Sequence, residues 1–147
     1  MEKQHREEVI KRRNEQARNQ IEECRKRDEE LDRERSAICQ SGMIPETVFL
    51  TKSEIDKKEF CERKSGKTDI TKDVISVAWE ALFNADKEEK QRLVNLPGER
   101  KGQKRPIVIS MDKEDKEKLK YCRYSSIMKE SDAYSLGLEL YKRRIMN

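Results

Sequence analysis

The segment KRPIVISMDKEDKEKL (104–119) restricts the possible folds of this chain more than any other feature. Its β-branched run predicts a short strand, and the charged run that follows predicts a helix. The surrounding sequence is mostly helical in pattern, and a single strand cannot satisfy its own backbone hydrogen bonds. A partner strand must therefore be present, and its position decides the architecture.

The segment ETVFLT (46–51) is the best candidate for the partner strand. Each of the two strands precedes a charged helix, a turn and a more apolar helix, so the pattern is an internal repeat. The apolar helices align as SVAWEALF and SLGLELYK, about 60 residues apart. We expect residues 46–51 and 106–111 to pair antiparallel, because this pairing satisfies both strand edges and encloses both apolar helices in one core.

Glycine, proline and capping residues divide the chain. Thr51 or Ser53 is expected to cap the first charged helix, and Gly66 to end it. Asp112 is expected to cap the second charged helix. The segment DKEEKQRLVN (86–95) is expected to prolong the first apolar helix or to add a turn. The predicted parts are a long charged N-terminal helix (1–40), a first repeat (41–95), a basic linker (96–105) and a second repeat (106–147).

The N-terminal helix carries half of a coiled-coil seam. Apolar residues recur every seven positions, but the matching positions three residues later are all polar. This pattern leaves two interpretations open: a helix that self-associates or binds a protein partner weakly, and a solvated helix that lies on the body through one narrow stripe. The apolar series is Ile10, Ala17, Cys24, Leu31 and Ile38, and the polar series is Arg13, Gln20, Arg27 and Glu34.

Composition and charge favour a binding protein. The chain is 44% charged and 33% hydrophobic, which suits small modules that share a core better than an enzyme with a deep pocket. The net charge of +4 comes from the last third, since residues 97–147 hold 13 basic and 8 acidic side chains. We therefore expect an anionic partner there, with nucleic acid as the first candidate.

Several other functions have little support in the sequence. The single histidine, His5, and four widely spaced cysteines predict free thiols, with no metal site and no cofactor. SGKT (65–68) lacks the earlier glycine of a phosphate-binding loop, because Cys61 stands in that place. There is no apolar run of membrane-spanning length and no signal-peptide core, so we expect a non-enzymatic, cytoplasmic protein without a membrane partner.

The repeated order of a six-residue strand and two helices, the second ending in an apolar run, resembles the ribbon-helix-helix family of Arc-type and MetJ-type DNA-binding proteins. In that family two copies pair their strands and interlock their helices, and the ribbon enters the major groove. The resemblance covers about 100 residues. It implies a mainly α fold with one short two-stranded antiparallel ribbon, in which both repeats form an intramolecular pseudo-dimer, as in the tandem TraY-like arrangement.

The resemblance and strand alternation together assign site residues. The inward residues would be Val48, Leu50, Ile107, Ile109 and Met111, and the base-facing residues Thr47, Phe49, Thr51, Val108 and Ser110. The phosphate-contacting residues would be Thr71, Lys72, Lys129 and Ser131 at the starts of the second helices, with Lys104 and Arg105 from the linker. Arg100 and Lys101 would belong to the same flexible basic arm.

The predicted ribbon face departs from the family in one respect. Base readers are usually Arg, Lys, Asn, Gln or Thr, whereas this face offers Thr, Ser, Phe and Val. The leading prediction is a double-stranded-DNA-binding transcriptional repressor or autoregulator. The alternatives are a relaxosome accessory protein at a plasmid transfer origin, and a protein-binding adaptor or inhibitor with no role on DNA.

Overall fold

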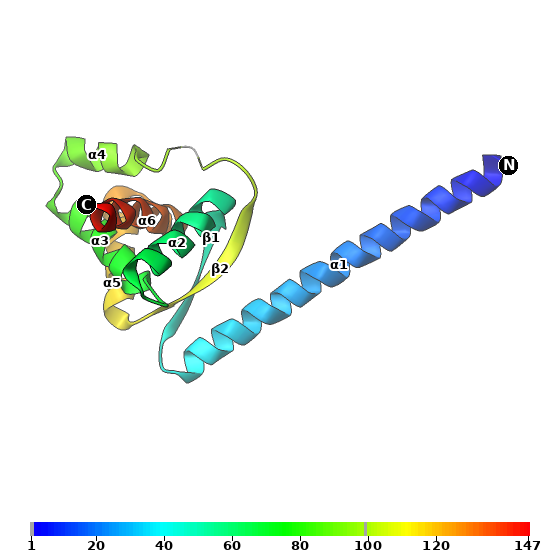
Figure 1. Ribbon diagram of the computed structural model, residues 1–147, viewed down its shortest axis with the longest axis horizontal. Coiled ribbons are helices and arrows are strands. Elements are labelled where there is room, and N and C mark those ends of the chain that lie inside the picture. Colours follow the sequence, from blue (N-terminus) through cyan, green and yellow to red (C-terminus); the bar gives the residue numbers. More distant parts are fainter. Residues whose placement is uncertain (1, 99) are drawn as a thin grey trace. The chain divides into compact units, whose positions relative to one another are not determined.

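The computed structural model describes residues 2–98 and 100–147 (Figure 1). Residues Ile38–Asn147 form one compact unit, and the preceding part of helix α1 (Glu2–Gln40) forms another. The 39 residues of α1 confirm the predicted long N-terminal helix.

The compact unit contains two strands and five helices among its described residues. In chain order they are β1 (Ile44–Thr51), α2 (Lys52–Ser65), α3 (Thr71–Asn84), α4 (Lys87–Asn95), β2 (Lys104–Met111), α5 (Lys113–Ser126) and α6 (Glu130–Met146). The order strand, helix, helix therefore occurs twice, with α4 between the two occurrences (Figure 1).

Strands β1 and β2 form the predicted antiparallel pair, from Ile44 opposite Met111 to Thr51 opposite Lys104. Both strands begin earlier than predicted, so Lys104 and Arg105 are strand residues and do not belong to a flexible linker. This two-stranded ribbon is the only sheet in the described part of the chain.

Pro106 lies inside β2, where a missing N–H would normally break the ladder. Its partner Phe49 uses its backbone groups elsewhere: the N–H donates to Ser131 Oγ at 2.9 Å, and the C=O accepts from Arg100. In antiparallel sheets every second pair exchanges no ladder bonds. Pro106 occupies such a pair, so its missing N–H costs the ribbon no ladder hydrogen bond.

Capping residues explain where the helices begin. The Thr51 hydroxyl accepts from Glu54 N–H at 3.2 Å while the Glu54 carboxylate accepts from Thr51 N–H at 2.8 Å, which is a capping box. Asp112 and Asp115 form the same arrangement at the start of α5. The predicted caps at Thr51 and Asp112 are thus confirmed.

Two helix ends follow the local sequence. Gly66 ends α2 in the left-handed conformation with φ of 70°, as predicted. Helix α4 does not prolong α3, because Ala85 is extended and Asp86 caps a new helix by accepting from Glu89 N–H at 2.8 Å.

The core lies between one face of the ribbon and helices α2, α3, α5 and α6 (Figure 1). Four of the five residues predicted to face inward are buried, and Ile107 is half-buried. The buried set also includes Cys61 and Cys122, which are free thiols. Alternation along each strand therefore predicted the core face correctly.

Helices α3 and α6 are in close contact at Gly137. A Cβ atom there would lie 2.3 Å from the backbone oxygen of Val74. Because backbone cannot move aside as a flexible side chain can, this crossing requires glycine.

We expect Gly137→Ala to lower the free energy of unfolding by about 1–3 kcal/mol through overpacking. At an unobstructed helix position the same change would raise stability by about 1 kcal/mol. Chemical denaturation monitored by circular dichroism measures the difference. A stabilised variant would contradict the close approach of α3 and α6.

Candidate functional site

The ribbon face opposite the core is the candidate binding surface. Phe49 is 48% exposed and Thr47 and Val108 are half-buried, all on this face. Strand alternation adds Pro45 and Pro106 to the same face, and Ser110 at one end. The face is mostly apolar, with hydroxyls at Thr47 and Ser110.

Thr51 does not share this surface. It is only 7% exposed, and its hydroxyl caps α2. The prediction that Thr51 faces solvent is therefore wrong, because the residue that ends the strand also begins the helix.

The start of α3 is not arranged to meet an anion. Thr71 is 3% exposed, so it is too buried to contact phosphate as predicted. Lys72 is exposed, but its Nζ lies 2.8 Å from Asp112 Oδ2 and 3.7 Å from Asp115 Oδ1. The hydrogen bond from Lys72 lowers the pKa of Asp112 to about 2, and the cation is largely neutralised within the chain.

The start of α6 has a mixed character. Lys129 is exposed at the N-cap position, whereas Ser131 is half-buried and accepts the Phe49 N–H. Glu130 and Asp132 lie in the first turn of α6, where their negative charges interact favourably with the helix dipole but would repel a phosphate. Of the six residues predicted to contact phosphate, Lys104, Arg105 and Lys129 are exposed and form no ion pair with another described residue.

A buried ion-pair network fixes the linker against the end of the ribbon. The Arg100 side chain is 8% exposed and binds Glu54 through two nitrogens, at 2.8 and 2.9 Å. It also donates to Asp132 Oδ1 at 2.8 Å and to the Phe49 carbonyl. Arg100 therefore is not part of a flexible basic arm, because its charge is used inside the body.

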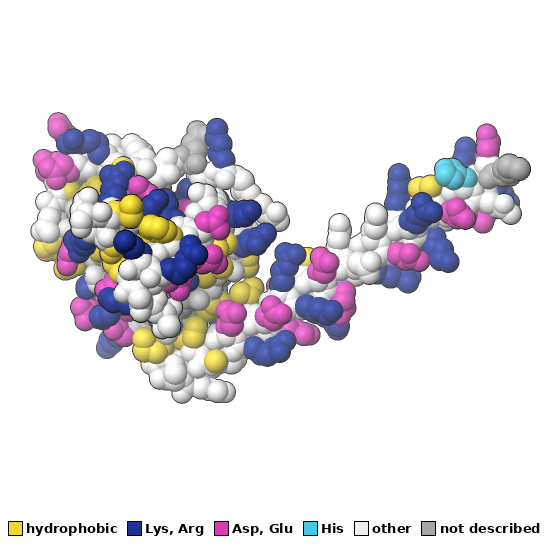
Figure 2. Space-filling model, viewed as in Figure 1, with side chains coloured by type: hydrophobic (Ala, Val, Ile, Leu, Met, Phe, Trp, Pro, Cys, Tyr) yellow, Lys and Arg dark blue, Asp and Glu magenta, His cyan; other side chains and the backbone are white. Residues whose placement is uncertain are grey.

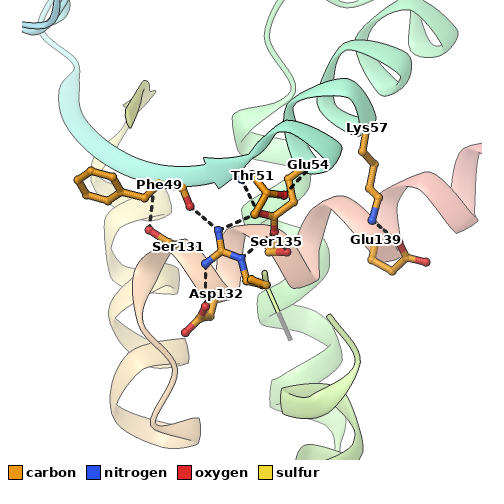
Figure 3. A network of polar contacts seen from close by, with 9 residues as sticks. Phe49, Thr51, Glu54, Lys57, Ser131, Asp132, Ser135 and Glu139 are labelled. Atoms are coloured by element: carbon orange, nitrogen blue, oxygen red, sulfur yellow. Dashed lines mark hydrogen bonds and ion pairs between the residues drawn. The ribbon is translucent and has the colours of Figure 1, made fainter. Parts of the chain in front are cut away.

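Figure 3 shows how this network gathers three elements. Glu54 comes from α2, Asp132 and Ser135 from α6, and Phe49 from β1. The Ser135 hydroxyl donates to Glu54. The Glu54 carboxylate thus accepts hydrogen bonds from a hydroxyl, a backbone N–H and a guanidinium. No local signal in the sequence could have revealed the side-chain bonds of Arg100 to Glu54 and Asp132 and of Ser135 to Glu54, since these partners lie 32 to 81 positions apart.

The network controls the ionisation of Glu54. Burial by itself would raise the pKa of this carboxyl, but hydrogen bonds from Arg100, Ser135 and Thr51 outweigh burial and lower the pKa to about 2. Glu54 is therefore charged at every pH at which the protein is expected to fold.

A groove of about 670 Å³ runs beside the ribbon. Its most exposed apolar side chains are Tyr124 at 76%, Ile127 at 93% and Phe49. The lining residues are Thr47, Phe49, Arg123, Tyr124, Ile127, Met128, Lys129, Glu130 and Ser131. Sequence reasoning identified the ribbon and helix-start residues in this groove but missed Tyr124 and Ile127.

Ile127 has an unfavourable backbone conformation. It ends α5 in the left-handed region, with φ of 53° and ψ of 41°, where a β-branched residue is strained. The first repeat uses Gly66 for the same purpose, with no steric cost. Strain of this kind often marks a functional surface.

No family model, no curated protein and no solved structure matches this chain. Across residues 2–98 and 100–147, no helix combines the length and apolar content that a bilayer crossing requires. The same residues contain no group of three or more His, Cys, Asp or Glu side chains placed to hold a metal ion.

We expect Arg100→Met to lower the free energy of unfolding at neutral pH by about 3–5 kcal/mol, because it leaves the Glu54 charge buried and unpaired. The double variant Arg100→Met/Glu54→Gln should recover much of this loss, since glutamine keeps the capping box. Urea denaturation measures both. Equal losses in the single and double variants would contradict the buried ion pair.

The pH dependence gives a separate test. The pKa of Glu54 is lower in the folded state, so its contribution is present above about pH 4.5 and is lost as pH falls toward 2. Glu54→Gln should reduce the dependence of stability on pH over that window, and Glu117→Gln, at an exposed position of α5, is the control. Thermal melts between these pH values measure the effect. If Glu54 were not paired, Glu54→Gln would leave the slope of stability against pH unchanged.

We expect Ile127→Gly to raise the free energy of unfolding by about 1 kcal/mol, because glycine removes the left-handed strain and no buried contact is lost. The reciprocal change, Gly66→Ile, should lower it by a similar amount. Thermal denaturation compares the pair. Destabilisation by Ile127→Gly would show that the side chain contributes to folding.

Proposed function

We propose that the chain binds double-stranded DNA through the β1–β2 ribbon and acts as a transcriptional repressor or autoregulator. The proposal includes a tandem ribbon-helix-helix arrangement, with β1–α2–α3 and β2–α5–α6 as the two equivalent halves of a pseudo-dimer. It rests on the register of the ribbon.

The helix caps Thr51 and Asp112 define the offset between the repeats, since positions 51 and 112 differ by 61. Positions 47 and 108 differ by the same 61, and Thr47 lies directly opposite Val108. Equivalent residues thus face each other at the middle of the ribbon, as twofold symmetry between two halves would require. The same offset relates Cys61 to Cys122, which are both buried.

B-DNA admits a two-stranded ribbon in its major groove, so the exposed face of β1 and β2 could enter that groove. Thr47 and Ser110 could bond to several base edges, while Phe49 and Val108 could pack on thymine methyl groups. Lys104 and Arg105 are exposed at one end of the ribbon and could meet phosphates. Binding of a promoter by this surface would repress transcription by occupancy.

One observation favours a second candidate function, protein binding by an adaptor or inhibitor. The groove beside the ribbon exposes Phe49, Tyr124 and Ile127, and Ile127 is held there at a steric cost. An apolar surface of this kind suits a protein ligand better than a phosphate backbone.

Fluorescence anisotropy with labelled duplex at several salt concentrations tests DNA binding in the full-length protein. We expect Lys104→Ala/Arg105→Ala to weaken binding and to reduce the slope of log affinity against log salt by about 1.8. Lys87→Ala/Arg92→Ala on α4 is the charge-matched control, because both side chains are exposed on a helix that does not belong to the ribbon.

Thr47→Ala/Ser110→Ala addresses sequence preference in the same assay. We expect this variant to keep its affinity for random duplex and to lose discrimination for a selected site, because hydroxyls read base edges and do not hold phosphates. Failure of the wild-type protein to bind any duplex at low salt would exclude DNA binding and leave protein binding as the remaining candidate.

A further inference from the structure

The outward face of the ribbon is symmetric in its backbone register but not in its side chains. The offset of 61 positions between the helix caps exchanges the two end pairs of this face and leaves the middle pair in place. The facing pairs are Pro45 with Ser110, Thr47 with Val108, and Phe49 with Pro106. Phe49 at one end of the face therefore corresponds to Ser110 at the other, and the two side chains differ in size and polarity.

We propose that the ribbon requires thymine in the half of the duplex that meets Phe49 and not in the half that meets Ser110. Phe49 packs on the thymine methyl group, and Ser110 hydrogen-bonds to a base edge at the symmetry-related position. The recognised duplex is therefore non-palindromic and binds in one orientation. This inference rests on the proposed binding of double-stranded DNA and names the class of duplex that the ribbon takes.

The two side chains have different requirements in the major groove. Thymine is the base that presents a methyl group there, and the Phe49 ring has no donor or acceptor for the polar edges of the other bases. The Ser110 hydroxyl both donates and accepts, so it can bond to any of the four bases. Selection for thymine thus acts on one half of the site only.

The contacts of Phe49 hold its ring in place for this role. Phe49 is 48% exposed, and its ring extends away from the ion-pair network (Figure 3). Its N–H donates to Ser131 Oγ at 2.9 Å, and its C=O accepts from Arg100. Because the backbone is fixed by both groups, little conformational freedom is lost when the ring meets a base.

The supporting contacts at the other end of the face are different. Ser131 is the second residue of α6, and the second residue of α3 is Lys72. A lysine ammonium cannot accept an N–H, so Lys72 cannot hold Ser110 as Ser131 holds Phe49. Lys72 instead donates to Asp112 Oδ2 at 2.8 Å. The difference between the two reading side chains is thus accompanied by a difference in the residues behind them.

Charge also distinguishes the two ends. Lys104 and Arg105 lie at the Phe49 end of the ribbon, and both are exposed. The residues 61 positions earlier are Met43 and Ile44, which carry no charge. Helix α1 adds no net charge, because its 11 basic and 11 acidic side chains are both distributed along it (Figure 2). Phosphate contacts by Lys104 and Arg105 therefore strengthen the half-site that Phe49 reads and fix the orientation of the duplex.

Selection of duplexes from a random pool by the full-length protein tests the symmetry of the site. For the wild-type protein we expect a consensus with thymine in one half-site and no thymine preference at the symmetry-related position. Ser110→Phe should add that second preference, and Phe49→Ser should remove the first, because each variant has the same residue at both ends. Phe83→Ser is the matched control, since Phe83 is 57% exposed on α3, outside the ribbon.

Replacing the selected thymine by deoxyuridine removes only the methyl group. In fluorescence anisotropy this replacement should weaken wild-type binding about fourfold, the effect of leaving one methyl group unburied. Binding by Phe49→Ser should not respond to the replacement, whereas Phe83→Ser should respond as the wild type does. Ser110→Phe should respond at both thymines, so the test measures a gain of sensitivity as well as a loss.

Three results would overturn this inference and leave DNA binding itself intact. They are a palindromic wild-type site, wild-type binding without sequence preference, and a response of Phe49→Ser to deoxyuridine equal to that of the wild type. If the wild-type protein binds no duplex at low salt, the proposed function and this inference are both wrong.

Discussion

The body of this protein depends on hydrogen bonds between two strands that are far apart in the sequence. Neither β1 nor β2 has another strand beside it, so each supplies the backbone partners of the other. The side chains on one face of the ribbon then join the apolar helices α3 and α6 in a single core. Helices α3 and α6 can approach closely only because Gly137 has no Cβ atom. Each strand-helix-helix segment is thus incomplete alone.

A two-stranded ribbon has two open edges, and open edges favour unwanted pairing with other chains. The outer edge of β1 is occupied at Phe49, whose N–H and C=O are bound by Ser131 and Arg100. The opposing Pro106 has no N–H to offer on β2. Arg100 is held in turn by Glu54 and Asp132, so the ion pair that anchors the linker also closes part of an edge.

Local patterns predicted the strands, the helix caps and the core face, because these depend on residues within a few positions of one another. The antiparallel pairing also followed, since an unpaired strand is so unfavourable. The predicted exposure of Thr51 and the predicted phosphate contact of Thr71 were wrong, because both depended on which element each residue would complete. The prediction that Arg100 belongs to a flexible basic arm was wrong for a related reason. A basic residue near glycines is typical of a solvated linker, and only the fold brings a distant carboxylate, here Glu54, beside it.

The two ends of the ribbon differ in a way that bears on any partner. At one end Lys72 is neutralised by Asp112, while at the other Lys104 and Arg105 are exposed. Between them the face is apolar, and the groove that contains Ile127 borders only one side. If DNA enters as proposed, phosphate contacts concentrate at one end, and the proposed twofold relation between the two halves is not matched by the charge. An asymmetric ligand therefore fits this surface better than a palindromic one.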